Sequence, residues 1–144
     1  MNWYIIALKK YATFTGRAQR SEYWYFILFN YLIALVLALI DSMTGTFNMM
    51  SGYGLLMGLF SLAMFIPITA VGVRRLHDTD RSGWWMLLEL IPFIGSIVLI
   101  KYAVADVKVA MLLPIIGFVV LITFLVQDSQ ASENRFGANP KAAG

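Results

Sequence analysis

Cysteine is absent from this chain of 144 residues, and that absence excludes disulfides, thiolate metal sites and cysteine nucleophiles. Histidine occurs once, as His77, so the nitrogen and sulfur ligands that zinc sites usually combine are not available. Charge is also scarce, because 13% of the residues are charged while 60% are apolar. Ordinary soluble domains are about 25% charged and about 45–50% apolar. The composition therefore predicts that much of the surface faces lipid.

Four apolar runs are present, and each is long enough for a membrane-crossing helix, which needs roughly 17–25 residues. They lie at residues 23–40, 53–73, 84–100 and 109–126. Backbone groups in lipid must be hydrogen-bonded within their own segment, so helices are predicted. The predicted fold class is an all-α integral membrane protein with one domain, residues 1–144. Its parts are an interfacial leader at residues 1–22 with a helix expected over residues 3–14, about four transmembrane helices, and a polar tail at residues 127–144, expected to be loosely ordered.

The distribution of Lys and Arg predicts the side of each loop, because cytoplasmic loops are enriched in both. The leader holds four, the loop after the second run three, the loop after the third run two, and the tail two. A cytoplasmic N-terminus with four crossings puts nine of the eleven inside. If residues 84–100 instead enter the membrane and return, the tail lies outside and the inside count is again nine. The side of the tail therefore stays open.

The third and fourth runs resemble each other. Residues 90–95 (LIPFIG) match residues 112–117 (LLPIIG) at a spacing of 22 residues. The match indicates a tandem duplication of one membrane segment, in which Pro92 and Pro114 are each expected to kink a helix. The alternative is convergent composition, because Gly and Pro are common in membrane helices.

Five arginines are predicted to converge if the leader and the loop after the second run face the same side. They are Arg17, Arg20, Arg74, Arg75 and Arg81. Such a cluster can hold lipid phosphates, or a partner protein, through charge-assisted hydrogen bonds. The alternative interpretation is that these arginines are topology determinants and salt-bridge partners of Glu22, Asp78 and Asp80.

The dipeptide His77-Asp78 has the form of a general base beside a residue that orients it. No serine lies in a recognisable nucleophile elbow, so the pair is interpreted as structural and the protein as non-enzymatic. One of residues 78–80 is expected to cap the third apolar helix. Trp84 and Trp85 are expected to anchor that helix at the membrane surface.

Polar residues inside the apolar runs are candidates for function or helix packing. Glu89 lies about 7 Å inside the third run, at about 1.5 Å per residue, and it either lines a polar path or reaches back to an arginine at the interface. Asn30 is expected to bond a neighbouring helix. Gly54 and Gly58 form a small-xxx-small motif, which lets another helix of this chain or of a second copy approach closely.

Three segments together resemble the DUF805 family of small bacterial inner-membrane proteins. They are residues 14–24 (FTGRAQRSEYW), residues 74–92 with their RRLHD, RSGWW and IP elements, and residues 133–140 (ENRFGANP). The resemblance covers nearly the whole chain and implies a bacterial inner-membrane location, but it implies no activity, since none is established for the family. Two features depart from the family pattern. Two apolar runs follow the tryptophan pair where one is usual, and Glu89 stands where the family is apolar.

The sequence thus predicts a non-enzymatic, multi-pass inner-membrane protein with a cytoplasmic N-terminus and no cofactor, metal or nucleic-acid partner. Its expected role is that of a membrane scaffold, or of a module that binds partner proteins or anionic lipid headgroups through the cytoplasmic arginine face. The alternative is a small oligomeric transporter or channel subunit, in which Glu89 and Asn30 line a polar path.

Overall fold

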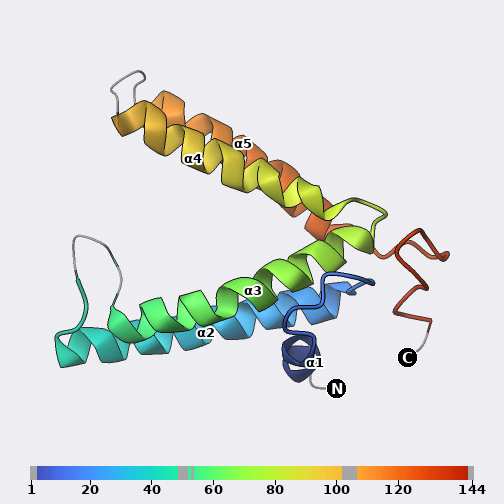
Figure 1. Ribbon diagram of the computed structural model, residues 1–144, viewed down its shortest axis with the longest axis horizontal. Coiled ribbons are helices and arrows are strands. Elements are labelled where there is room, and N and C mark those ends of the chain that lie inside the picture. Colours follow the sequence, from blue (N-terminus) through green and yellow to red (C-terminus); the bar gives the residue numbers. More distant parts are fainter. Residues whose placement is uncertain (1–2, 49–51, 53, 102–106, 143–144) are drawn as a thin grey trace. The chain divides into compact units, whose positions relative to one another are not determined.

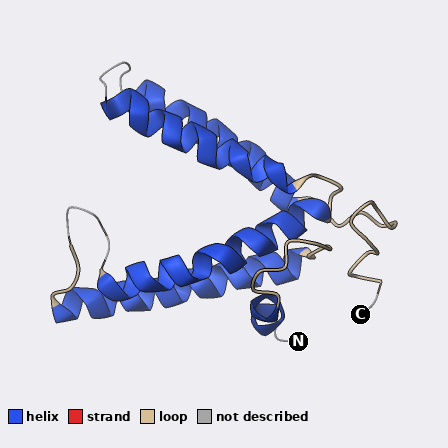
Figure 2. Ribbon diagram, in the orientation of Figure 1, coloured by secondary structure: helices blue, strands red, loops and turns tan. Residues whose placement is uncertain are grey.

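Helices make up the regular structure of the part of the chain that the computed structural model describes, residues 3–48, 52, 54–101 and 107–142 (Figure 2). Within α4 and α5 the side chains of some residues, Glu89 among them, also lie outside the described part. The helices are α1 (Trp3–Lys9), α2 (Arg20–Thr44), α3 (Leu55–His77), the short 3-10 helix η1 (Gly83–Met86), α4 (Leu87–Lys101) and α5 (Val107–Val126). The predicted all-α class is confirmed.

The long helices extend beyond their apolar runs where charged residues suit a helix end. α2 begins at Arg20 rather than at residue 23, and Glu22 in its first turn complements the positive end of the helix dipole. α3 continues to His77 rather than residue 73, with basic side chains in its last turn beside the negative end of the dipole. α1 ends at Lys9, so the helical part of the leader is shorter than predicted.

The chain divides into two compact units, and each is described by itself. Unit 1 comprises Met1–Phe14 and Ser21–Val71, and unit 2 comprises Thr15–Arg20 and Gly72–Gly144. In unit 1, α2 and α3 run side by side in opposite directions (Figure 1). α1 joins this pair through stacked aromatic rings of α1 and α2. The apolar pattern alone does not reveal the division into two units.

The turn between α2 and α3 is organised by one buried carboxylate, that of Asp41. Its Oδ1 accepts hydrogen bonds from the backbone N–H of Leu56 at 3.1 Å and from the Thr46 hydroxyl at 2.6 Å. Its Oδ2 accepts from the Met57 N–H at 2.9 Å. N–H groups in the first turn of a helix have no acceptor within the helix. Asp41 therefore caps α3 from the preceding helix, and a Cβ on Gly54 would overlap its side chain.

α3 ends in a Schellman arrangement that reverses the chain toward η1. The N–H of Asp80 donates to the carbonyl of His77 at 3.0 Å, and the N–H of Arg81 donates to that of Leu76 at 3.0 Å. Asp80 has a φ of 58°, in the left-handed region that usually holds glycine at this position. The predicted capping role of residues 78–80 is therefore wrong, because they terminate the preceding helix. Ser82 caps the next one.

In unit 2, α4 and α5 pack side by side as an antiparallel pair (Figure 1). η1 approaches α3 closely where Gly83 faces Val73, and a Cβ on Gly83 would lie 2.7 Å from the valine side chain. This close contact requires glycine, since no other residue leaves the space.

The outward faces of the helices are apolar. Two helices, Arg20–Thr44 and Leu55–Asp78, are long and apolar enough to cross a membrane, and only 17% and 22% of their most apolar stretches are buried. A core helix of a soluble protein would be mostly buried, so these faces suit contact with lipid. A shorter apolar helix covers Pro114–Val126. Exposed large side chains occur on all four long helices, for example Leu39, Leu62, Ile94 and Ile115.

Candidate functional site

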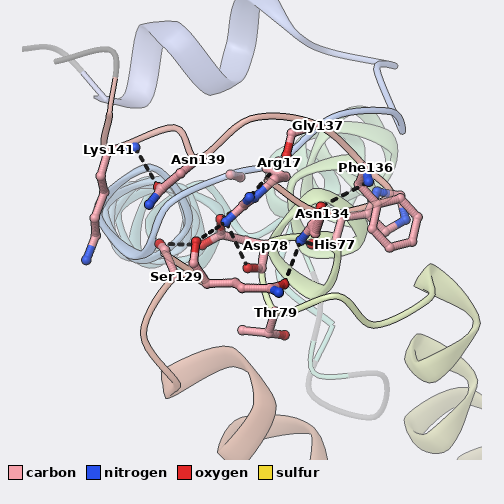
Figure 3. A network of polar contacts seen from close by, with 12 residues as sticks. Arg17, His77, Asp78, Thr79, Ser129, Asn134, Phe136, Gly137, Asn139 and Lys141 are labelled. Carbon is pink, nitrogen blue, oxygen red and sulfur yellow. Dashed lines mark hydrogen bonds and ion pairs between the residues drawn. The ribbon is translucent and has the colours of Figure 1, made fainter. Parts of the chain in front are cut away.

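The polar residues of unit 2 gather at the C-terminal end of α3, where the loop before α2 and the polar tail meet (Figure 3). At the centre is the arginine–aspartate cluster, which we define as Arg17, Arg75 and Asp78. The side chains of all three are at most 1% exposed. Because they come from a loop, a helix end and the turn after it, the cluster ties three parts of unit 2 together.

Asp78 is the only carboxylate in this cluster, and both of its oxygens are occupied. Oδ1 accepts from Nε of Arg17 at 2.9 Å. Oδ2 accepts from the guanidinium of Arg75 and from the Ser129 hydroxyl. A buried charge is tolerated only when it is paired and hydrogen-bonded, and Asp78 meets both conditions.

Arg17 uses its guanidinium to hold the tail. Nη2 donates to the carbonyl of Gln130 at 2.7 Å, and Nη1 donates to those of Ser132 at 2.9 Å and Gly137 at 3.1 Å. A further bond joins Nη2 to the carbonyl of Asp78 at 3.3 Å. With the Nε bond to the Asp78 carboxylate, all five guanidinium donors have an acceptor. The tail is therefore a folded part of unit 2, and the expectation of a loosely ordered tail is wrong.

Arg75 holds the end of α5 in a similar way. Its Nε donates to the carbonyl of Leu125 at 3.0 Å, and its other nitrogens reach the carbonyls of Gln127 and Ala18. Arg74 is also buried, at 1% exposure. Three of the five predicted arginines, Arg17, Arg74 and Arg75, thus point into the protein. The pairing of arginine with Asp78 agrees with the alternative interpretation of the sequence.

His77 serves packing. Its ring lies parallel to that of Phe136 with 3.7 Å between centroids, and its Nδ1 lies 3.1 Å from the carbonyl of Gly16. The side chain of Asn134 donates to the carbonyl of His77 at 2.9 Å, and it also shapes the tail turn that ends at Gly137. Gly137 has a φ of 123°, which favours glycine. The pair His77-Asp78 is thus committed to contacts with the loop and the tail.

The half-exposed arginines surround the C-terminal end of α5. Arg81 lies over the Phe124 ring, 4.2 Å from its centroid, and donates to Oε1 of Gln127 at 2.7 Å. Trp85, which is 41% exposed, meets the same ring edge-on. Arg20 pairs with Asp128 at 3.1 Å. We call Arg20, Arg81 and Trp85 the collar, because all three contact residues 124–128.

The tail adds exposed ion pairs beside the collar. Arg135 pairs with Asp80 at 3.2 Å, and Lys141 pairs with Asp128. The hydrogen bond from Lys141 lowers the pKa of Asp128 below its ordinary value, and the Ser129 N–H lowers it further. Exposed pairs of this kind contribute little to stability, so their cations are available to other anions.

The other predicted residues fall elsewhere. Asn30 is buried in unit 1, where its Nδ2 donates to the Phe26 carbonyl of its own helix at 2.8 Å and not to the neighbouring helix that was expected. Gly54 faces Asp41 of its own chain, while a Cβ on Gly58 would meet no atom within 4 Å. The side chain of Glu89 lies outside the described residues. Trp84 is 77% exposed, as an interfacial anchor would be.

Carbonyl oxygens supply most of the acceptors that the described residues bring to this site. Among the described residues, no group of three or more His, Cys, Asp or Glu side chains is placed to hold a metal ion. The loop before α2, the end of α3 and the tail form one polar layer, which we call the polar cap. Cations are exposed at its edge. The role of the tail was missed from the sequence, although the turn residues Asn134 and Gly137 were a usable signal.

Comparison with known proteins gives a consistent result. Residues 11–138 match a family model described as a protein of unknown function, DUF805. The chain is 43% identical over 141 residues to inner membrane protein YhaH of Escherichia coli (strain K12), and the match covers 98% of both chains. It is 44% identical over 102 residues to inner membrane protein YhaI of the same strain, which covers 71% of this chain and 82% of that protein. No solved structure matches the chain.

Proposed function

The chain belongs to the DUF805 family, and on that premise we propose that it is a non-enzymatic, multi-pass inner-membrane protein that binds anionic lipid headgroups through its collar. The collar is a smaller surface than the face of five arginines predicted from the sequence. Arg17, Arg74 and Arg75 are buried, so Arg20 and Arg81 carry the headgroup contacts.

The position of the collar carries the proposal. Arg20 and Arg81 both contact residues 124–128, where the apolar α5 gives way to the polar tail. This boundary is where headgroups lie beside a membrane helix. Stacking on Phe124 fixes the guanidinium of Arg81, so little side-chain freedom is lost when it binds a phosphate.

The fold of unit 2 supports a cytoplasmic N-terminus and a cytoplasmic tail, with four crossings. Arg17 bonds Asp78 and the tail directly, and such contacts cannot cross a bilayer. The number of crossings between residue 81 and residue 127 is therefore even. α5 is about 30 Å long, and η1 with α4 reaches a similar length, so both suit a hydrocarbon core of about 30 Å.

The same contacts support a non-enzymatic role. Asp78 is bound by Arg17, Arg75 and Ser129, and His77 is stacked on Phe136. Both oxygens of this buried carboxylate are bonded to residues other than His77, so Asp78 does not orient the histidine as a base.

Lipid binding is tested by native mass spectrometry of the full chain, released from bilayers with equal amounts of phosphatidylglycerol and phosphatidylcholine. The double variant Arg20→Gln/Arg81→Gln is expected to retain less phosphatidylglycerol, by about fivefold for each arginine, since one basic residue near the surface contributes about 1 kcal/mol. Lys101→Gln, at the other end of α4, is the matched control. Equal retention by the double variant and the control would refute the proposed lipid site.

Topology is tested separately by labelling single cysteines from each side of the membrane, since the chain has no cysteine of its own. Thr15→Cys and Ser132→Cys are expected to react from the cytoplasmic side. Met43→Cys, at the far end of α2, is expected to react from the opposite side. Reaction of Ser132→Cys only from outside would contradict the four-crossing topology.

A further inference from the structure

One groove in unit 1 collects polar groups within an apolar region. It lies between α2 and α3 and has a volume of about 300 Å³. Asn30 and Tyr31 of α2 line it together with Ser61, Met64 and Phe65 of α3. Tyr31 and Phe65 are 68% and 67% exposed, so the rim of the groove is open to the surroundings of the helix pair.

The amide of Asn30 is only half satisfied. Its Nδ2 donates to the carbonyl of Phe26, but its Oδ1 is buried and has no donor among the described residues. A buried acceptor without a donor is costly, and such groups in native proteins need an explanation. The groove therefore lacks one hydrogen-bond donor.

Tyr31 has a hydroxyl donor that lacks an acceptor, since it makes no hydrogen bond within the described part of the chain. Tyr31 lies eleven residues after the start of α2 at Arg20, or about 16 Å along the helix, near the middle of a hydrocarbon core of about 30 Å. A hydroxyl exposed at that depth has no water to bond and requires a protein acceptor.

We infer that this groove is a self-association site, in which Tyr31 of one copy enters the groove of a second copy and donates to Asn30 Oδ1. Two copies inserted in the same orientation are related by a two-fold axis along the membrane normal. A given residue therefore lies at the same depth in the membrane in both copies. Tyr31 and Asn30 differ in depth by only about 1.5 Å. Each copy thus supplies the donor that the other lacks, twice across one isologous interface.

The chemistry of the groove favours a second copy over a charged partner, because none of the residues that line it is charged. Met64 and Phe65 suit an inserted aromatic ring, since sulfur–aromatic and aromatic pairs are favourable. The terminal torsion of asparagine is broad, so the amide can turn toward an incoming hydroxyl at small cost.

Self-association is measured by energy transfer between donor- and acceptor-labelled full chains, carrying Ser132→Cys as the label site, in neutral phosphatidylcholine vesicles at increasing protein density. Neutral lipid separates this test from headgroup binding. We expect association that Tyr31→Phe weakens about 9-fold to 400-fold, since both symmetric bonds are lost and each interhelical hydrogen bond in a membrane contributes about 3-fold to 20-fold. Asn30→Leu is expected to weaken it similarly. The double variant should associate no more weakly than the weaker single variant, because each single variant already removes both of the bonds.

The matched control is Tyr25→Phe, which removes a hydroxyl from an exposed tyrosine of α2 outside the groove and should leave association unchanged. Helical circular dichroism checks that each variant folds. The proposal is overturned by a chain that stays monomeric at every density, in which case lipid or other helices of the same chain fill the groove. It is equally overturned by association that Tyr31→Phe and Asn30→Leu leave unchanged, or by additive effects of the two.

Discussion

Among the residues that the structure describes, each unit has one fully buried aspartate, and the two are neutralised by different means. Asp78 in unit 2 is held by two guanidinium groups and a serine hydroxyl. Asp41 in unit 1 is held by two backbone N–H groups and a threonine hydroxyl. The first carboxylate binds two full charges, one of them from a distant part of the chain, while the second binds the partial charge of a helix end.

The two kinds of partner correspond to two structural roles, closing a local hairpin and joining remote segments. Asp41 and its partners lie within sixteen residues of one another, so the carboxylate closes a local helical hairpin. Asp78 meets Arg17 across a sequence separation of 61 residues, and Arg17 reaches on to Gly137. Charge pairing therefore appears where remote segments must be joined, and backbone capping suffices where neighbouring helices turn.

The largest expected effect comes from making the same substitution at both sites. Asp78→Asn leaves two buried guanidinium groups without a counter-charge and is expected to lower the free energy of unfolding by about 3–5 kcal/mol. Asp41→Asn is expected to cost only about 1–2 kcal/mol, because the amide keeps one acceptor oxygen for the helix end while its NH2 group replaces the other acceptor. Unfolding of the full chain in detergent, followed by circular dichroism, measures both. Equal losses would show that the two carboxylates do the same work.

The next effect concerns the shape of the cation. Arg17→Lys keeps the charge beside Asp78 but loses the planar fork that bonds the carbonyls of Gln130, Ser132 and Gly137. We expect a loss of about 2–3 kcal/mol and release of the tail, seen as faster proteolysis within residues 127–142. Arg135→Lys, at an exposed pair, is the control and should leave proteolysis unchanged. An undisturbed tail in Arg17→Lys would contradict the role given to the fork.

A smaller effect tests the niche around Asp41. Gly54→Ala places a Cβ onto the Asp41 side chain and is expected to cost about 1–3 kcal/mol. Gly58 lies in the interior of α3, and a Cβ added there would meet no atom of the described residues within 4 Å. Gly58→Ala is therefore expected to be neutral or to stabilise by about 0.5–1 kcal/mol, since alanine is more stable than glycine in a helix. The pair is compared by thermal unfolding in detergent. Equal losses at both positions would instead indicate a helix packed against Gly58.

The smallest effect is a shift in titration. The pKa of Asp128 is lowered chiefly by the hydrogen bond from Lys141, so the small stabilisation it gives is present above its ordinary pKa and lost as the pH falls through the lowered value. Lys141→Gln is expected to move the pKa of Asp128 upward, toward its ordinary value. Carboxyl nuclear magnetic resonance in micelles follows the titration. A pKa that does not move would assign the shift to other groups.

The helices were largely predictable, because apolar runs of membrane length have few alternatives. Which arginines turn inward was not predictable, since an arginine beside an apolar run, such as Arg74, Arg75 or Arg81, can face either a headgroup or the protein interior. The tail was missed for a related reason. Arg17 recognises carbonyl oxygens there, and every residue carries one, so no side-chain pattern marks the contact. Lys and Arg counts also left the side of the tail open, and only the contacts of Arg17 favour one topology.

The bonds of Arg17 also have a consequence for the order in which the protein is made. Arg17 leaves the ribosome early, but its acceptors at Ser132 and Gly137 are synthesised near the end. α2 to α5 are therefore synthesised while the guanidinium is still hydrated. The polar cap closes only after translation is nearly complete, so a truncated chain keeps an open cap that quality-control proteases can recognise.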